Sequence, residues 1–169
     1  MKLELTGKEK PAVFSEAEKF LHDLGLKIVA TDASRPWGGF FVIDEKQVHD
    51  FGKLFFPGEN LSDFSGSKLS PKILLVQPNT RLSWQYHHRR AEIWAVVSGK
   101  VGVITSDDDK EGSLTELNSG DNIRLAQGRR HRLVGLEGWG IIAEIWQHTN
   151  PANPSNEEDI VRVQDDFGR

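Results

Sequence analysis

From residue 72 onward, the sequence is a succession of short strand-like runs separated by turn signals, and this pattern constrains the fold more than any other feature. Turns are marked by Pro78-Asn79, Ser98-Gly99 and residues 107–112. The runs are rich in β-branched and aromatic residues and cover 73–77, 81–87, 92–98, 101–106, 122–126, 132–134, 140–146 and 160–163. Many closely spaced strands predict a mainly β sandwich or barrel.

Two helices are predicted in the first third of the chain. Ser15 followed by Glu18 fits a capping box, and Gly25 ends the apolar run that follows. A second helical pattern starts at Asp44 and ends at Pro57-Gly58. The apolar residues at helical spacing are Phe14, Ala17, Leu21 and Leu24 in the first helix, and Val48, Phe51, Leu54 and Phe55 in the second.

Length and composition favour one compact domain, residues 1–169, with a helical and extended segment at 1–70 and the barrel at 71–169. The formal net charge is −4 and no basic run occurs, so nucleic acid is not an expected partner. The polar N-terminus and the lack of a long apolar run argue against a signal peptide and a membrane span, which predicts a cytoplasmic protein. The absence of cysteine leaves nitrogen and oxygen ligands for any metal.

Residues 81–87 alternate cleanly between polar and apolar side chains. Because side chains two apart share a face of a strand, one face carries Arg81, Ser83, Gln85 and His87, and the other carries Leu82, Trp84 and Tyr86. The polar face is expected to line a wet cavity inside the barrel. The apolar face is expected either to pair with a second copy in a homodimer or to be covered by the N-terminal helices.

Four residues are candidate metal ligands: Gln85, His87, Glu92 and His131. Gln85 and His87 share one strand face, Glu92 begins the next strand, and His131 begins a later one. Amide, carboxylate and imidazole ligands suit Zn²⁺, Mn²⁺, Fe²⁺ or Co²⁺. Gln85 is the weakest of the four ligands, and His88 is expected to face the other way.

The spacing of these residues resembles the two motifs of the cupin superfamily. In the first motif, two ligands at i and i+2 are followed by a Glu and a Gly, which here are Gln85, His87, Glu92 and Gly99. In the second motif, a Gly and a Pro-x-Gly precede a His, which here are Gly120, Ala126-Gln127-Gly128 and His131, with Ala in place of Pro. The resemblance implies a cupin (jelly-roll-like) β-barrel, here with two N-terminal helices.

Longer segments resemble type II phosphomannose isomerases. Gln85–Trp94 (QYHHRRAEIW) is similar to that family's QMHHHRAEHW, with Tyr86, Arg89 and Ile93 as departures that remove no expected ligand. Further similar segments are Arg35–Gly38 (RPWG), Val96–Gly99 (VVSG), His131–Leu133 (HRL), Glu158–Arg162 (EDIVR) and Phe167–Arg169 (FGR). The resemblance is to the isomerase half of these proteins, which often follows a sugar nucleotidyltransferase domain.

This resemblance implies an enzyme that interconverts mannose 6-phosphate and fructose 6-phosphate and uses one divalent metal ion, with Zn²⁺ as the first candidate. Arg90 and Arg162 are implied as catalytic groups that stabilise developing negative charge. Arg35, Arg81 and Arg132 are candidates for binding the phosphate. The general base is not identified, and Glu144 is as readily structural as catalytic.

Two alternatives stay open. One is a non-catalytic or regulatory sugar-binding cupin, which the departures Arg89 and Ile93 allow. The other is a metal-dependent oxygenase, which Gln85 in the first ligand position disfavours because such enzymes favour three His and one Glu.

Overall fold

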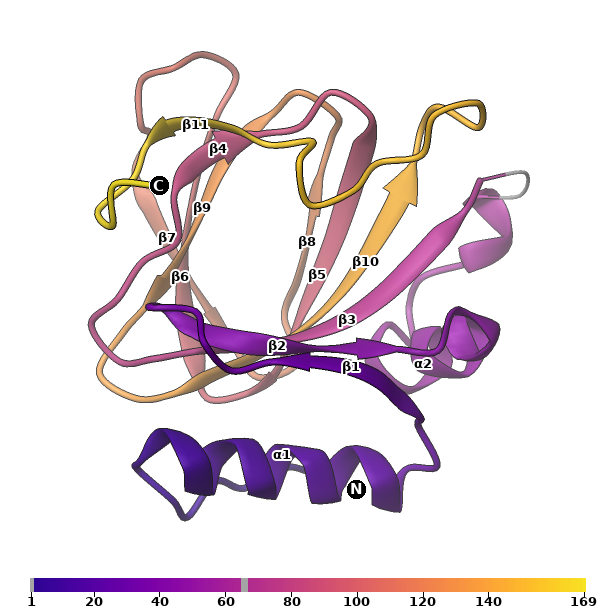
Figure 1. Ribbon diagram of the computed structural model, residues 1–169, viewed down its shortest axis with the longest axis vertical. Coiled ribbons are helices and arrows are strands. Elements are labelled where there is room, and N and C mark those ends of the chain that lie inside the picture. The colour runs from indigo at the N-terminus through magenta and orange to yellow at the C-terminus, as the bar shows by residue number, and fades with distance from the viewer. Residues whose placement is uncertain (1, 65–66) are drawn as a thin grey trace.

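The computed structural model describes residues 2–64 and 67–169, in which two antiparallel sheets face each other as a jelly roll (Figure 1). One sheet has the order β1-β2-β3-β10-β5-β8 and the other β11-β4-β9-β6-β7. The first sheet consists of β1 (Ile28–Asp32), β2 (Gly38–Ile43), β3 (Leu69–Val76), β10 (Gly140–His148), β5 (Arg90–Ser98) and β8 (Asn122–Leu125). The second consists of β11 (Val161–Gln164), β4 (Trp84–Tyr86), β9 (Arg130–Gly135), β6 (Lys100–Ser106) and β7 (Leu114–Asn118). The predicted mainly β, jelly-roll-like fold with two N-terminal helices is confirmed.

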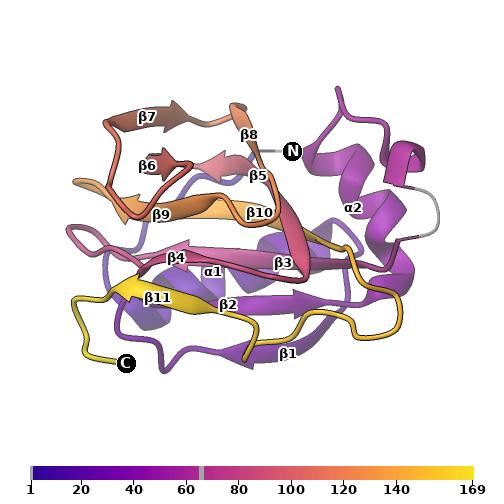
Figure 2. The same ribbon diagram turned by 90° about the horizontal axis from the view of Figure 1, so that it is seen from above.

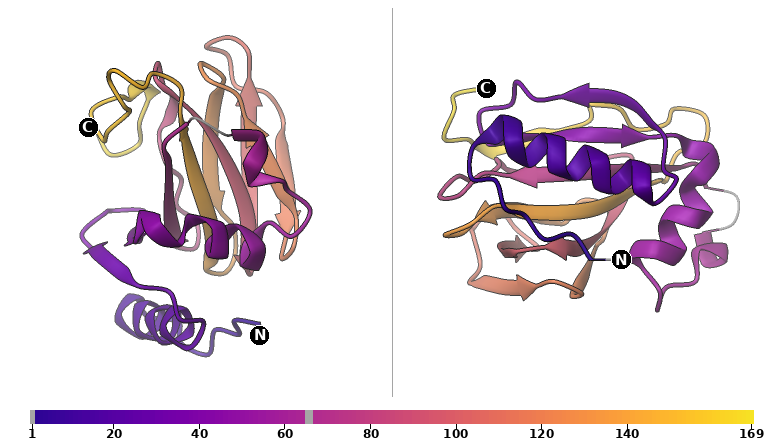
Figure 3. Two further views of the ribbon diagram at one scale, coloured as in Figure 1. Left: turned by 90° about the vertical axis from the view of Figure 1, so that its right-hand side faces the viewer. Right: turned by 90° about the horizontal axis from the view of Figure 1, so that it is seen from below.

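Alternating side chains of the first sheet build two separate cores. The inner face packs against the second sheet, and the buried residues between them include Leu74, Val76, Val96 and Ile142 of the first sheet and Leu133 of the second. The outer face packs against α1 (Lys10–Asp23) and α2 (Val48–Phe55), with Ile73, Leu75, Ile93, Ile141 and Ile145 among its buried residues. Figure 3 shows both helices on this side of the molecule. The helices therefore stabilise the sheet from outside, and the space between the sheets is left for a site.

The first helix begins at Lys10, five residues before the predicted capping box. Pro11 occupies its first turn, where a missing N–H costs nothing. Ser15 therefore lies inside the helix, and Glu16 accepts hydrogen bonds from the backbone N–H groups of Thr6 and Gly7. The second helix agrees with the prediction: the Asp44 side chain caps a short 3-10 turn, Glu45–Gln47, that leads into α2.

Strands β1, β2 and β7 were not predicted. Strand β2 begins with Gly38 and Gly39, which in sequence look like a turn. At Gly38 the backbone has a φ of 138°, and an added Cβ would lie 1.8 Å from the carbonyl oxygen of Leu75 on β3. Only glycine allows this close approach of β2 to β3. The first sheet thus already includes part of the segment 1–70.

The apolar face predicted for residues 81–87 is covered by the chain itself. Trp84 is fully buried, and its indole N–H donates to the carbonyl oxygen of Asp109 (2.9 Å). The guanidinium of Arg130 stacks on the ring of Tyr86. The N-terminal helices cover the other sheet, so the expectation that they cover this face is wrong. The face also gives no support to a homodimer, which stays a prediction.

Within the described residues, neither helix is both long enough and apolar enough to cross a membrane. Viewed from above, β11 and β4 lie side by side, and the segment that connects β10 to β11 passes over one end of the sheets (Figure 2). This end is where the candidate site lies.

Candidate metal centre

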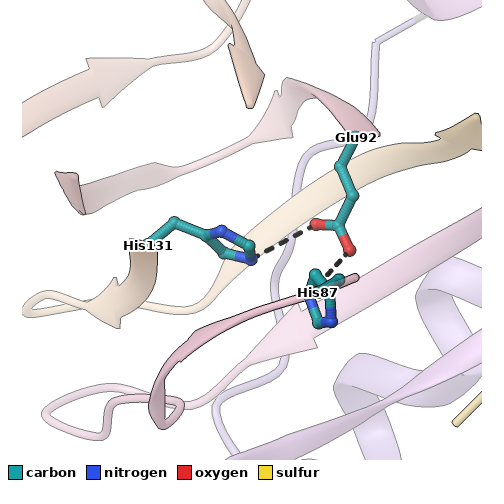
Figure 4. Close-up of side chains that lie close together, drawn as sticks. All are labelled: His87, Glu92 and His131. Atoms are coloured by element: carbon teal, nitrogen blue, oxygen red, sulfur yellow. Dashed lines mark ion pairs between the residues drawn. The ribbon is translucent and has the colours of Figure 1, made fainter. Parts of the chain in front are cut away.

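Three side chains converge between the two sheets (Figure 4): His87 directly after β4, Glu92 in β5 and His131 in β9. The Nε2 atom of His87 lies 3.2 Å from Oε1 of Glu92, and Nε2 of His131 lies 3.6 Å from Oε2. All three residues are buried, and one potential ligand atom from each lies within 4.8 Å of the other two. Imidazole and carboxylate groups at this separation could hold a divalent ion.

Both histidines are oriented by backbone carbonyl groups. Nδ1 of His87 lies 2.7 Å from the carbonyl oxygen of Asp159, and Nδ1 of His131 lies 2.9 Å from that of Arg129. Since a carbonyl only accepts, each Nδ1 donates a proton and each Nε2 presents a lone pair to the site. Nε2 of His131 is buried without a hydrogen-bond partner among the described residues. These donors therefore fit a metal ion.

The charges of the cluster also suit a cation. Burial lowers the pKa of His131 to about 4, which keeps this imidazole neutral near pH 7. Burial alone would raise the pKa of Glu92, but the charge of Arg90, together with the contact to His87, outweighs it and holds that pKa well below its usual range. An ionised carboxylate and a neutral imidazole are the forms that bind metals.

Arg90 is fixed beside the cluster. Its Nε donates to Oε1 of Glu92 (2.7 Å), and a terminal nitrogen lies 3.2 Å from Nε2 of His87. The other terminal nitrogen donates to Oγ of Ser155 (3.0 Å), and the guanidinium stacks on Trp146. The predicted catalytic arginine is thus a buried cation whose position is set from three sides.

Gln85 lies in a row of residues that crosses the second sheet. It pairs with His131 on β9 and with Arg162 on β11. Directly opposite side chains share a face, so these three side chains project to the same side. Gln85 lines the same cavity as Glu92, and its Oε1 accepts a hydrogen bond from Ser83 (2.5 Å). Its role as a fourth ligand stays a prediction.

Glu92 lines a cavity between the sheets, and Glu144 and Lys72 lie opposite each other on its wall. The indole N–H of Trp94 is shared by Glu92 (3.1 Å) and Glu144 (3.0 Å). Burial, together with the charge of Glu92, raises the pKa of Glu144 to about 8. Of these two carboxyl groups, Glu92 is therefore ionised and Glu144 protonated near neutral pH.

The two arginines predicted to be catalytic are placed differently, and their catalytic role stays a prediction. Arg90 contacts Glu92 and His87 directly, whereas Arg162 lines the cavity one strand beyond Gln85. Of the three predicted phosphate ligands, Arg35 also lines the cavity.

The other two predicted phosphate ligands lie outside this cavity. Arg81 forms a two-point ion pair with Asp166, with distances of 2.6 and 2.9 Å. Arg132 follows His131 in β9 and therefore points to the opposite face, where it pairs with Glu111. The structure thus brings neither guanidinium to the candidate ligands.

Several cavity residues were not expected from the sequence: Lys72, Trp146, Glu157 and Arg169. A signal was present for Lys72, which is a charged residue at the start of an apolar strand. Glu144 gives the same signal within IIAEIW, where its neighbours are buried and apolar. For Arg169 no local pattern existed, because only the tertiary fold brings it to the cavity.

Residues 62–165 match the family described as Mannose-6-phosphate isomerase C-terminal. The chain belongs to this family. Its relatives include the alginate biosynthesis protein AlgA of Pseudomonas aeruginosa, which is 33% identical over 135 residues, 80% of this chain and 22% of the relative. Mannose-1-phosphate guanylyltransferase of Escherichia coli is 28% identical over 141 residues, 83% of this chain and 24% of the relative. The chain therefore spans less than a quarter of the length of these relatives.

Solved structures show that this member of the Mannose-6-phosphate isomerase C-terminal family shares its fold with other proteins. Oxalate decarboxylase of Bacillus subtilis aligns with a TM-score of 0.56 at 12% identity, over 80% of this chain and 31% of that one, and it has Mn(II) centres. Hazelnut vicilin aligns with a TM-score of 0.54 at 15% identity, over 82% of this chain and 36% of that one. At this identity the likeness concerns the fold alone.

The departures from the isomerase-like motif leave the ligand cluster intact. Ile93 is buried in the outer core opposite Ile145, on the far side of the sheet from the cavity. Arg89 lies 3.8 Å from the carboxylate of Asp159. Neither residue contributes to the His87–Glu92–His131 cluster.

Proposed function

We propose that the protein is a metal-dependent aldose–ketose isomerase that interconverts mannose 6-phosphate and fructose 6-phosphate. The observation that carries this proposal is the buried His87–Glu92–His131 cluster, whose Glu92 lines a cavity together with Arg90 and Glu144. Family membership supports it, and so do relatives that are named mannose-1-phosphate guanylyltransferases.

His87, Glu92 and His131 would hold the metal, with Gln85 as the fourth ligand. Zn²⁺ is the first candidate, and Mn²⁺, Fe²⁺ and Co²⁺ accept the same donors. When bound, the ion supplies positive charge that stabilises the anionic oxygens of the substrate. Arg90 adds a second, fixed positive charge at the same place, held there by Glu92 and Ser155.

Glu144 is the proposed proton carrier. With a pKa of about 8, a minor fraction of Glu144 is ionised near pH 7. In this ionised form it takes the proton from C2 of the aldose and returns it to C1, while the hydroxyl proton of O2 passes to O1. Atoms balance, and the product is the ketose. Glu144 is buried at the cavity wall, so water does not compete for the proton.

The test is an isomerisation assay on the purified protein with mannose 6-phosphate, after metal removal and after addition of each divalent ion. We expect turnover only with metal, and none in His131→Ala. A parent protein that binds metal and sugar phosphate but shows no turnover with any ion would contradict the proposal and favour a sugar-binding module.

A further inference from the structure

The guanidinium of Arg162 has no hydrogen-bond or ion-pair partner among the described residues. It lines the cavity, and its Nε is buried. A buried N–H group that lacks an acceptor costs roughly 1–3 kcal/mol, and more when it is charged. A ligand that accepts hydrogen bonds at this point would remove that cost.

Two more arginines reach the same part of the cavity from separate segments. Arg35 comes from the loop between β1 and β2, and Arg169 from the segment after β11. Each is held by one carboxylate: Arg35 by Asp32 (2.8 Å) and Arg169 by Asp165 (3.0 Å). Burial lowers the pKa of Arg162, and the charges of Arg169 and Arg35 lower it further, while Asp165 and Glu157 act in the opposite direction. Arg169 and Arg35 therefore lie close enough to Arg162 to repel its charge.

We propose that Arg162, Arg35 and Arg169 form an anion subsite that binds the phosphate group of a sugar phosphate. Three forked donors from three segments suit a tetrahedral dianion with several free oxygens, whereas a carboxylate would satisfy only one fork. Lys72 also lines this cavity and adds positive charge, although Glu157 pairs with it.

The row across the second sheet sets the distance between this subsite and the metal centre. Arg162 pairs with Gln85, and Gln85 with His131, so Arg162 and His131 are two strand spacings apart, about 10 Å between their backbones. A sugar phosphate lying along this row would place its phosphate at Arg162 and its other end at the metal. This assignment rests on the proposed function and moves Arg162 from the catalytic to the substrate-binding residues.

The experiment is calorimetric titration of the metal-loaded protein with mannose 6-phosphate, mannose and inorganic phosphate. We expect mannose 6-phosphate to bind at least tenfold more tightly than mannose, and phosphate to compete with it. Arg162→Gln should weaken mannose 6-phosphate binding by about 10- to 100-fold and leave mannose binding unchanged. The affinity of Arg162→Lys for mannose 6-phosphate should lie between those of the parent and Arg162→Gln, because lysine keeps the positive charge but lacks the two-pronged guanidinium. Arg129→Gln is the matched control, since that exposed side chain lies outside this cavity.

Arg35→Gln serves as a second variant if Arg162→Gln does not fold, and it should show the same selective loss. Equal affinity of parent and folded variant for mannose 6-phosphate would overturn the subsite, as would equal affinity of the parent for mannose and mannose 6-phosphate. Phosphate-dependent binding without isomerisation would support the subsite and overturn the proposed function. Isomerisation with no preference for the phosphorylated sugar would support the proposed isomerase activity and overturn the subsite.

Discussion

The two ends of the space between the sheets are built from the same strands and differ in chemistry. At one end the inward side chains are charged or aromatic, and at the other they are aliphatic. From the charged end to the aliphatic end, the inward side chains of β3 are Lys72, Leu74 and Val76. Those of β5 are Glu92, Trp94 and Val96, and those of β10 are Trp146, Glu144 and Ile142. One strand therefore supplies both a site residue and a core residue, two to four positions apart.

This difference separates stability from function. Burial of aliphatic side chains stabilises the fold by about 25 cal/mol per Å² of apolar surface. Burial of charged groups opposes folding unless each is paired, and replacing such groups with apolar ones is often neutral or stabilising. The charged end is therefore hard to explain by stability, and substitutions at the two ends should have different consequences.

The largest effect is expected at the charged end, for His131→Ala. It removes a ligand whose Nε2 has no partner within the described chain, so metal occupancy and turnover should fall to background while the metal-free protein stays folded. Elemental analysis, the isomerase assay and circular dichroism measure these quantities. The matched control is His88→Ala, an exposed neighbour of His87. Full metal occupancy in His131→Ala would remove His131 from the ligand set.

The opposite result is expected two positions further along β9. Leu133 is fully buried at the aliphatic end, and Leu133→Ala should lower the free energy of unfolding by about 2–5 kcal/mol. Urea unfolding measures this change. The folded variant should bind one equivalent of metal, as the parent does, and a loss of metal from it would show that the two ends are coupled.

Arg90→Ala tests whether the charged end contains a group that serves turnover without binding the metal. Loss of one transition-state donor typically costs about 10²–10³ in rate. We expect this loss at unchanged metal occupancy, together with lower stability of the metal-free protein, where Glu92 would lose its pair. Turnover equal to that of the parent would exclude the catalytic role of Arg90.

The sequence predicted the cluster better than its surroundings, for a physical reason. His87, Glu92 and His131 were found from motif spacing, although Glu92 lies in the first sheet and His131 in the second. The alternation at 81–87 was extended too far, since β4 spans only Trp84–Tyr86. Irregular backbone before it lets Leu82 line the cavity and Arg81 leave it.

The fold was predictable where its patterns were strong. Buried strands and the α2 stripe follow from periodicity, but β1 and β7 are edge strands with mostly exposed side chains, so no apolar pattern marks them. The convergence of Arg35, Arg162 and Arg169 depends on tertiary contacts between segments distant in sequence, which no local pattern encodes.

A further effect is expected in the pH dependence of the metal-free protein, and it concerns Glu144 and Ile142 on β10. The pKa of Glu144 is about 8 in the folded protein and near the ordinary value of 4.5 when unfolded. Between these values the unfolded chain releases a proton that the folded chain keeps, so stability falls as pH rises from about 4.5 to about 8. Glu144→Gln removes this loss. Its free energy of unfolding relative to the parent should therefore be higher at pH 8 than at pH 5, by on the order of a few kcal/mol.

Urea unfolding with a chelator present measures the difference. The control is Ile142→Val, at the aliphatic end of the same strand, which should give the same difference from the parent at both pH values. A Glu144→Gln difference that is also independent of pH would mean that the carboxyl group ionises as readily inside the protein as in water, and the distinction between the two ends would then not extend to Glu144.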